Sequence, residues 1–486
     1  MRLSDLTGPN HVLPADAASV QITGITADSR AVERGFLFAA LPGTKVDGAR
    51  FAMAAKGAGA AAILASERAD LPEGLGIPVV RANKPRKALA EMAARFHGRQ
   101  PASIVAVTGT NGKTSVAEFT RQIFEALGRR AASLGTLGLV RPGGAAYGSL
   151  TTPDPVSLHR SLAALATEEV THLALEASSH GLDQYRLDGV RLAAAAFTNL
   201  GRDHLDYHAT VEDYLAAKLR LFRVLLEAGR SAVVNADGAG SERVIDVAHA
   251  RGLKLITTGV LGETLRLANV RRDGFAQRLE VIYEGRTFEL LLPLVGAYQA
   301  ENALVAAGLA IAVGEEPARA IAAISAIKGV KGRVEIAGTA RGGLVVIDYA
   351  HKPEALSSVL DALRPFASSR LICVFGCGGD RDKGKRPIMG RIAAEKADIT
   401  IVTDDNPRSE TPSTIRTEVL GGTVGARGEV RDIGGRAEAI GAAIGMLSEG
   451  DVLVVAGKGH ETGQIVGNDT LPFSDHDVVA TFLARV

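Results

Sequence analysis

Cysteine is scarce in this sequence, since Cys373 and Cys377 are the only two among 486 residues. Two cysteines exclude a disulfide framework. A metal site built on them would need further ligands close by. We therefore interpret Cys373 as a small residue in a buried strand and Cys377 as one in the turn that follows.

The sequence also lacks an excess of charge of either sign, because Lys and Arg (55) nearly balance Asp and Glu (54). Binding to nucleic acid or to an anionic membrane is therefore not expected, and any phosphate binding must be local. The longest apolar run, around residues 303–313, is well short of the roughly 18 residues that span a bilayer. The N-terminal MRLSDLTGPN lacks the apolar core of a secretion signal. We expect a cytoplasmic monomer without membrane insertion.

The composition is that of a globular α/β protein, with 46% hydrophobic residues, 22% charged residues and 55 glycines. At about 100 to 200 residues per domain, this length predicts about three domains. The Ala-rich helical segment KALAEMAARFHGRQP ends at Pro101 and marks the first boundary. We predict domains at 1–100, 101–330 and 331–486.

Apolar strand segments alternate with helical segments in the second and third of these domains, which is typical of doubly wound parallel sheets. The predicted strands are at 172–176, 192–199 and 231–235 in the central domain, and at 344–348, 371–376, 399–404 and 451–457 in the C-terminal one.

A phosphate loop is predicted at TGTNGKT, between the apolar strand SIVAVTG and an amphipathic helix that ends at Gly128. The strict pattern has Gly at position 107, where this chain has Val. Backbone N–H groups at the start of a helix bind phosphates. Lys113 would reach the β and γ phosphates, and the Thr114 hydroxyl would help to hold Mg²⁺. ATP is the expected nucleotide, with contacts from Gly109, Thr110, Asn111, Gly112, Lys113, Thr114 and Ser115.

Four motifs, TGTNGKT, LALEASSHGLDQYR, NLGRDHLDYH and YLAAKLRLF, follow one another in an order that resembles the Mur ligases. Two further segments, DSRAVERGFLFAALPGTKVDG and DDNPR, resemble those of the family members that add meso-2,6-diaminopimelate to UDP-N-acetylmuramoyl-L-alanyl-D-glutamate. The resemblance covers nearly the whole chain. It implies a central phosphate-loop ATPase domain between a UDP-binding α/β domain and a Rossmann-like domain. It also implies cytoplasmic peptidoglycan synthesis through an acyl phosphate.

For catalysis, the resemblance implies Lys113, and a Mg²⁺ site formed by Thr114, Glu176, His204 and a carbamate on Lys218. Glu176 closes a strand beside the loop, where a carboxylate suits a hard cation. Taken alone, His204 is an unremarkable polar residue. The helical pattern around Lys218 predicts a solvent-exposed lysine one helical turn after Tyr214, with Leu215, Leu219 and Phe222 on the apolar stripe.

The resemblance assigns one set of residues to the uridine nucleotide, sugar and peptide: Ser29, Lys45, Thr151, Thr152, Ser178, Gln184 and Arg186. Without it, TTPDP is equally well a loop that enters a helix, with Asp154 or Thr152 as the cap.

The added amino acid would bind at Asp405, Asn406, Pro407 and Arg408, just past the carboxyl end of a strand. Arg408 can hold the extra carboxylate by which diaminopimelate differs from lysine, and the lysine-adding relatives lack it. The resemblance adds Arg381, Gly457 and Glu461, the last for the ammonium group. For ATP it adds Asn302, Arg333, Asp348 and His351, although Tyr298-Gln299 stands where the family more often has Phe-Asn.

Two alternatives stay open. One is another ligase of the superfamily: the lysine-adding enzyme, the D-alanyl-D-alanine-adding enzyme or folylpolyglutamate synthase. The other is a nucleotide-dependent switch that does not catalyse a reaction.

Overall fold

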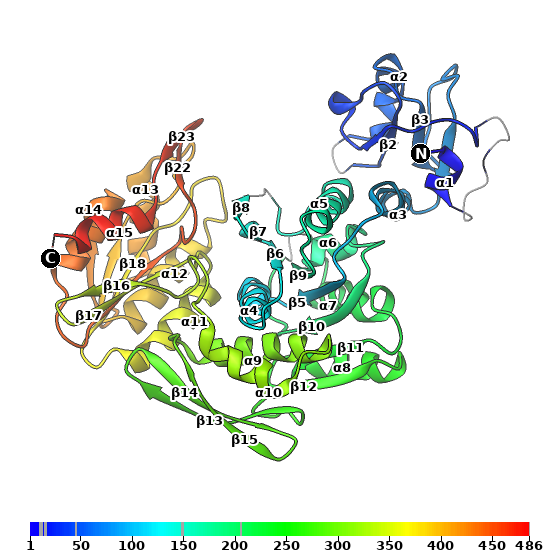
Figure 1. The fold of residues 1–486 in the computed structure, drawn as a ribbon. Coiled ribbons are helices and arrows are strands. Elements are labelled where there is room, and N and C mark those ends of the chain that lie inside the picture. Colours follow the sequence, from blue (N-terminus) through cyan, green and yellow to red (C-terminus); the bar gives the residue numbers. More distant parts are fainter. Residues whose placement is uncertain (9–12, 14–16, 44–45, 147–149, 205–206, 486) are drawn as a thin grey trace. The chain divides into compact units, whose positions relative to one another are not determined.

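The computed structural model describes residues 1–8, 13, 17–43, 46–146, 150–204 and 207–485. The chain divides into two compact units, whose helices and strands are labelled in Figure 1. The first comprises Met1–Glu263 and Val305–Ala320, and the second comprises Thr264–Leu304 and Ile321–Val486.

A small parallel sheet begins the first unit, with strands in the order β1-β2-β3-β4. Its strands are apolar on both faces because helices cover both. Leu37 and Leu64 pack toward α1 and α3, while Phe38 and Ile63 pack toward α2. The bounds are α1 (Leu3–Thr7), β1 (Gly24–Thr26), η1 (Ser29–Ala31), β2 (Phe36–Ala40), η2 (Gly48–Phe51), α2 (Ala52–Gly57), β3 (Ala62–Ser66), β4 (Val79–Ala82) and α3 (Pro85–His97).

A larger sheet follows in the same unit, with the order β12-β11-β10-β5-β9-β6-β7-β8. Its strands are parallel from β12 to β6, whereas β7 and β8 are antiparallel additions at the edge. The strands are β5 (Ser103–Thr108), β6 (Ala131–Gly135), β7 (Gly138–Arg141), β8 (Gly144–Ala146), β9 (His172–Glu176), β10 (Leu192–Phe197), β11 (Ser231–Asn235) and β12 (Lys254–Gly259).

Helices cover both faces of this sheet, so its strands are nearly continuous apolar runs. Ile104 and Leu173 face one core, formed with α5 to α8 and η3. Val105 and Ala174 alternate to the opposite face, and α4 lies against β6 and β9. The helices are α4 (Lys113–Ala126), α5 (Pro155–Thr167), α6 (Ser179–Asp183), α7 (Val211–Arg220), the π-helical η3 (Leu221–Leu225) and α8 (Ser241–Ala250).

The second unit contains three antiparallel strands in the order β13-β14-β15. It also contains a sheet with helices on both faces, in the order β16-β17-β21-β18-β19-β20. In that sheet only β16 is antiparallel. Helices α11 to α13 cover one face, and α14 and α15 the other. The strands are β13 (Leu265–Asp273), β14 (Ala276–Tyr283), β15 (Arg286–Leu292), β16 (Glu335–Ala340), β17 (Gly343–Asp348), β18 (Leu371–Phe375), β19 (Ile399–Val402), β20 (Glu429–Asp432) and β21 (Val452–Ala456), with a separate hairpin of β22 (Gly463–Val466) and β23 (Asp469–Pro472).

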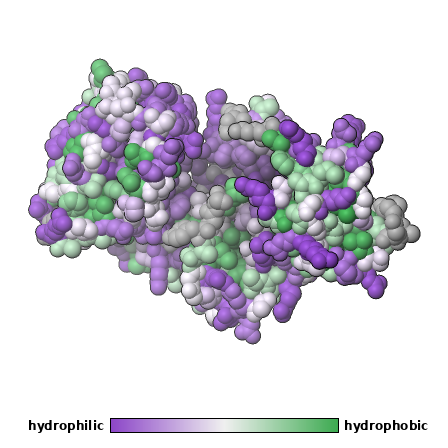
Figure 2. All heavy atoms as spheres, turned by 90° about the horizontal axis from the view of Figure 1, so that it is seen from above, coloured by the Kyte–Doolittle hydropathy of each residue, from purple (hydrophilic) through white to green (hydrophobic). Residues whose placement is uncertain are grey.

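The remaining helices are α9 (Ala297–Ala312), α10 (Pro317–Ala322), η4 (Ala323–Ala326), α11 (Pro353–Leu363), η5 (Arg364–Phe366), α12 (Lys385–Lys396), α13 (Pro412–Gly421), α14 (Arg436–Gly445) and α15 (Asp475–Leu483). Among the described residues, none of the helices has the length and apolarity to cross a bilayer. Figure 2 shows one face of the molecule, on which hydrophilic side chains predominate and apolar ones form small groups.

The predicted α/β fold class is confirmed, and every predicted strand has a counterpart within two residues at each end. Cys373 lies in β18 and Cys377 just after it; both are buried and unbridged, and burial raises the pKa of each thiol to about 12. The antiparallel pieces β7-β8 and β13-β15 were not predicted. The three domain boundaries stay a prediction.

Candidate functional site

The predicted phosphate loop joins β5 to α4. Gly112 is left-handed (φ 84°) at the N-cap of α4. Gly109 has φ 149°, and a Cβ there would overlap the Thr198 hydroxyl. The Thr110 N–H donates to Asn199 O at 2.8 Å, and the Asn111 N–H donates to Asn199 Oδ1 at 3.0 Å. Asn199, two residues past the end of β10, therefore fixes the loop; sequence reasoning placed it in the predicted strand 192–199 and gave it no role.

Lys113 and Ser115 lie at the start of the helix. The Lys113 ammonium donates to Gly109 O at 2.9 Å and to Thr110 O at 2.8 Å, so it lies over the loop. Ser115 is buried. Val107 is a fully paired, buried residue of β5, so the strand extends through the position where the strict motif has its first glycine.

Glu176 ends β9 and is buried beside the loop. It accepts from the Thr114 hydroxyl at 3.1 Å, from the Thr136 N–H at 2.7 Å and from the Thr136 hydroxyl at 3.3 Å. Thr136 follows β6, the neighbouring strand, and sequence reasoning missed it. In the sequence, the feature that could have indicated Thr136 is its position directly after Gly135, at the end of an apolar segment. These contacts fix the orientation of the Glu176 carboxylate.

Lys218 is buried, so the expectation of a solvent-exposed lysine was wrong. Its amine donates to Gly109 O at 2.6 Å and lies 4.1 Å from the centre of the Tyr214 ring. Burial lowers its pKa well below the usual value, and the positive charge of Lys113 lowers it further. The environment therefore favours a neutral amine next to the phosphate loop.

His204 is half-buried, with φ 55°, and its Nε2 lies 3.5 Å from Asp203 Oδ2. Its ring centroid is 5.9 Å from that of Tyr214, the ring that Lys218 also contacts. His204 also packs edge-on against His180. The four predicted Mg²⁺ ligands thus lie around the phosphate loop and α7.

This donor set fits Mg²⁺, which prefers one or two carboxylates plus phosphate oxygens to a cage of protein ligands. Glu176 and Thr114 supply hard oxygen donors side by side. Across the part of the chain that the structure describes, no three acidic, His or Cys side chains cluster as a metal cage.

The residues assigned to the sugar and peptide are brought together behind Glu176. Thr152 is buried and donates to Glu176 O at 2.8 Å, while Ser178 N donates to Thr152 Oγ1 at 3.0 Å. Arg186 donates to Thr152 O at 2.7 Å and to Gln184 Oε1 at 2.8 Å. The Thr151 hydroxyl is 3.2 Å from that of Thr136.

The alternative interpretation of TTPDP is also correct for Asp154, which caps α5 by accepting from Val156 N and Ser157 N. Thr152 is not the cap. Ser29 begins the short helix η1, which connects β1 to β2 of the small N-terminal sheet. Lys45 lies outside the described residues.

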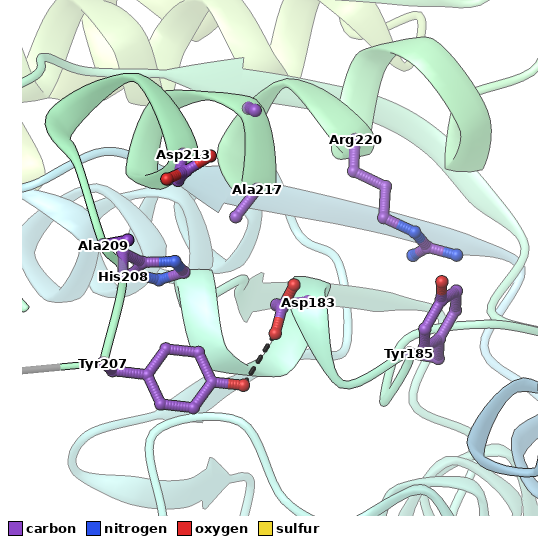
Figure 3. Close-up of a pocket in the computed structure, with 9 residues that line it drawn as sticks. Asp183, Tyr185, Tyr207, His208, Ala209, Asp213, Ala217 and Arg220 are labelled. Atoms are coloured by element: carbon purple, nitrogen blue, oxygen red, sulfur yellow. Dashed lines mark hydrogen bonds between the residues drawn. The ribbon is translucent and has the colours of Figure 1, made fainter.

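A pocket of about 550 Å³ lies beside α6 and α7 (Figure 3). Tyr207 donates to Asp183 at 2.6 Å at one end, and Arg220 lies 4.4 Å from the Tyr185 ring at the other. Asp183 and Tyr185 flank Gln184, so this pocket adjoins the proposed substrate residues.

In the second unit, the predicted amino-acid residues lie past the carboxyl ends of β18, β19 and β21. Asn406 Nδ2 donates to Glu461 Oε2 at 3.1 Å. Gly457, at φ 116°, places its backbone so close to Asp405 that a Cβ would be 2.8 Å from Asp405 Oδ2. Arg408, at φ 52°, donates to Gly379 O at 2.9 Å.

The guanidinium of Arg408 and the stem of Arg381 both lie near Gly378. Pro407 lies between Asn406 and Arg408, and a Cβ on Gly379 would overlap its carbonyl. Lys458 is fully buried here, with its Nζ 2.9 Å from Asn406 Oδ1. Sequence reasoning missed Lys458, although it lies inside the AGKGHE segment from which Gly457 and Glu461 were chosen.

The residues assigned to ATP in this unit surround Tyr349. Arg333 lies 4.7 Å from its ring centre, and His351 Nδ1 is 2.9 Å from its carbonyl. Asp348 accepts from Val334 N and Ala350 N, and burial raises its pKa. Asn302 is joined to Arg333 through Gln299. The Gln299 side chain accepts a hydrogen bond from Asn302 Nδ2 at 3.3 Å and donates one to Arg333 O at 3.4 Å.

Three family models match consecutive parts of the chain. They are the Mur ligase family, catalytic domain (21–97), the Mur ligase middle domain (107–310) and the Mur ligase, glutamate ligase domain (332–459). The chain belongs to the Mur ligase family. The predicted resemblance is therefore confirmed.

Mur ligases of known name match over the full length. UDP-N-acetylmuramoyl-L-alanyl-D-glutamate–2,6-diaminopimelate ligase of Bradyrhizobium diazoefficiens is 56% identical over 100% of this chain and 99% of its own. The ligase of the same name from Brucella melitensis is 56% identical over 100% and 98%.

Solved Mur ligase structures agree with the fold. A structure of a ligase with that name matches with a TM-score of 0.75 and 32% identity, and covers 100% of this chain and 99% of that one. The MurF ligase from Thermotoga maritima in complex with ADP matches with a TM-score of 0.62 and 18% identity over 96% and 97%, which concerns the fold alone.

Proposed function

We propose that this Mur ligase is a cytoplasmic enzyme that uses ATP to join meso-2,6-diaminopimelate to UDP-N-acetylmuramoyl-L-alanyl-D-glutamate. The amide would form at the D-glutamate γ-carboxylate during peptidoglycan precursor synthesis. The observation that carries the proposal is Arg408 beside Gly378, close to Arg381 and in the same loop as Asn406, which contacts Glu461. The arginines can bind a carboxylate and Glu461 can bind an ammonium group. Such a site suits an amino acid that carries a second carboxylate.

The reaction begins by activating a carboxylate, which is a poor electrophile. ATP transfers its γ-phosphoryl group to the γ-carboxylate, which gives an acyl phosphate and ADP. Backbone N–H groups in the first turn of α4 and the Lys113 ammonium would stabilise the charge that develops on the transferred group. Thr114, Glu176, His204 and the Lys218 carbamate would hold Mg²⁺, which supplies further neutralisation of phosphate charge.

Lys218 supports this site in a modified form. Its neutral amine attacks CO₂, an N–C bond forms, and loss of one proton leaves a carbamate anion. The depressed pKa of the amine favours this reaction, since only the unprotonated nitrogen is nucleophilic. Carbamylation would then place an anion beside the Lys113 ammonium, where the unmodified amine is neutral.

The second step uses the amino-acid site. Arg408 holds the distal carboxylate of diaminopimelate, and Glu461 holds an ammonium. The free amine of diaminopimelate attacks the acyl carbon, the C–O bond to phosphate breaks from a tetrahedral intermediate, and inorganic phosphate leaves. If lysine bound instead, the Arg408 guanidinium would lack a carboxylate partner. Sites of this kind discriminate against the substrate that lacks the group by a factor of about 10⁴ to 10⁵ in kcat/KM.

The test is ADP release and product formation with meso-diaminopimelate, lysine, D-alanyl-D-alanine or a folate plus glutamate as substrates. The wild-type protein should prefer diaminopimelate strongly, and Arg408→Ala should lose that preference. Arg431→Ala is the matched control, because Arg431 is an exposed arginine of the same unit that pairs with Glu429. Equal use of lysine and diaminopimelate by the wild type would overturn the proposal, and absence of turnover with every substrate would favour a switch.

A further inference from the structure

Lys458 is a fully buried lysine in the amino-acid site, and the backbone around it is tightly constrained. It lies between Gly457 (φ 116°) and Gly459 (φ 50°), both in conformations that favour glycine. A Cβ at Gly459 would lie 2.8 Å from the Tyr349 Cβ and 3.0 Å from Gly332 O. The direction of the Lys458 side chain is therefore set by the loop.

The ammonium of Lys458 points at three groups of the site. It lies 2.9 Å from Asn406 Oδ1, 3.2 Å from Glu461 Oε2 and 3.9 Å from Asp405 Oδ1. A buried ammonium is costly unless it is paired and hydrogen-bonded. Here it also separates two carboxylates that would otherwise repel each other.

These contacts determine which way the Asn406 amide faces. Its Oδ1 accepts from Lys458 Nζ and from Ile465 N at 3.0 Å. The reverse orientation would direct an amide NH₂ at an ammonium and an N–H, none of which can accept. Nδ2 is consequently directed at Glu461 Oε2, at 3.1 Å.

The two oxygens of Glu461 are thereby made different. Oε2 receives hydrogen bonds from both Lys458 and Asn406, whereas Oε1 receives a long one, 3.4 Å, from the Tyr349 hydroxyl. A long hydrogen bond is easily exchanged for a charge-assisted one. Oε1 is thus the oxygen that an incoming ammonium can take.

We propose that Lys458 is a positioning residue of the amino-acid site, which orients Asn406 and Glu461 so that Glu461 Oε1 receives the ammonium of the added amino acid. This rests on the proposed function. Lys458 also sets the charge balance of the site, because without it Asp405 and Glu461 would oppose the carboxylates of diaminopimelate.

The experiment compares Lys458→Met with wild type in steady-state ligation. The KM for meso-diaminopimelate should rise about 30- to 100-fold, as expected for the loss of hydrogen bonds to charged groups. The KM values for ATP and for the UDP-linked substrate should change less than about twofold, because Lys458 acts within one subsite. Lys396→Met is the matched control, because Lys396 is a partly exposed lysine on α12 that pairs with Asp361, away from the amino-acid site.

A double variant separates this role from a general loss of structure. If Lys458 acts through Glu461, Lys458→Met with Glu461→Gln should raise the KM for diaminopimelate no more than Glu461→Gln alone. The double variant also leaves no unpaired carboxylate at position 461, so it remains informative if the single variant folds poorly.

An unchanged KM for diaminopimelate in Lys458→Met, an equal rise in all three KM values, or additive effects in the double variant would overturn the inference alone. Wild-type protein that does not ligate diaminopimelate would overturn the proposed function and the inference with it.

Discussion

At the scale of single residues, the position of Lys218 opposes charge on its amine. Its pKa in the folded protein is well below that in the unfolded chain. Between these two pKa values the unfolded chain binds a proton that the folded protein does not, so stability rises with pH there. A non-titrating residue of similar length should abolish that slope.

We therefore expect Lys218→Met to be more stable than wild type at pH 7 and to lose at least about 10³-fold in kcat, since it would remove the proposed carbamate anion at the Mg²⁺ site. Urea unfolding from pH 7 to 10 in CO₂-free buffer measures the first effect, and ligation rates measure the second. Lys254→Met, at the exposed first residue of β12, is the control. An unchanged pH slope in Lys218→Met would contradict this account.

Thr136 provides a second test at this scale. Thr136→Val removes the hydroxyl that donates to Glu176 and keeps the backbone N–H that also does so. We expect kcat to fall about tenfold, the effect of losing one hydrogen bond to a charged group, while Thr136→Ser stays within about threefold. Equal activity of the Val and Ser variants would show that the hydroxyl does not orient the carboxylate.

Lys218 and Thr136 also show where sequence reasoning ends. The spacing around Lys218 correctly predicted the buried stripe of α7, but the contact that buries the lysine is with Gly109, which is 109 residues away. A helical pattern describes one face of a helix and not the loop that covers its edge. Lys458 was missed because a lysine between two glycines in sequence is typical of an exposed turn.

At the scale of elements, α5 depends on its cap. Asp154 accepts from two N–H groups of the first turn, so Asp154→Ala should cost about 1 kcal/mol of unfolding free energy. Asp154→Asn, which keeps an acceptor oxygen, should cost only a few tenths. Urea unfolding at pH 7 measures both, and an equal loss in the two variants would mean that the charge, not the acceptor, matters.

The same helix carries a group sensitive to acid. His159 is buried, its Nε2 lies 3.0 Å from Asp188 O, and burial lowers its pKa to about 4. As the pH falls below 6.5, His159 takes up a proton in the unfolded chain but not in the folded protein, so the free energy of unfolding falls. The loss is complete below about pH 4 and amounts to roughly 3 kcal/mol. His159→Gln, which keeps a donor for that carbonyl, should show a shallower loss between pH 6.5 and 4.5 in thermal unfolding.

The buried strands were predictable from the sequence. A strand that helices cover on both faces is a nearly continuous apolar run, with few polar residues between the apolar ones. The antiparallel ribbon β13-β14-β15 was not predictable, because its strands place exposed residues such as Arg266 and Arg272 among apolar ones. Its pairing, Arg271 with Arg278 for example, depends on register across a turn rather than on composition.

At the scale of the whole molecule, the proposed mechanism assigns the two chemical steps to residues of different units. Lys113, Glu176 and Lys218 belong to the first, and Asn406, Arg408 and Glu461 to the second. We expect Arg408→Ala to form the acyl phosphate at a rate near that of wild type, but to lose ligation of diaminopimelate. Hydroxylamine, which traps acyl phosphates without an amino acid, measures the first step in the same preparation. Loss of trapping in Arg408→Ala would refute this division.

Gly135 lies next to Glu176 in a backbone conformation that any residue adopts, yet even an added methyl group would overlap the carboxylate. Any side chain at position 135 would therefore have to displace the Glu176 carboxylate. A compound that filled the space beside this carboxylate would lie against a glycine whose replacement also moves the acid.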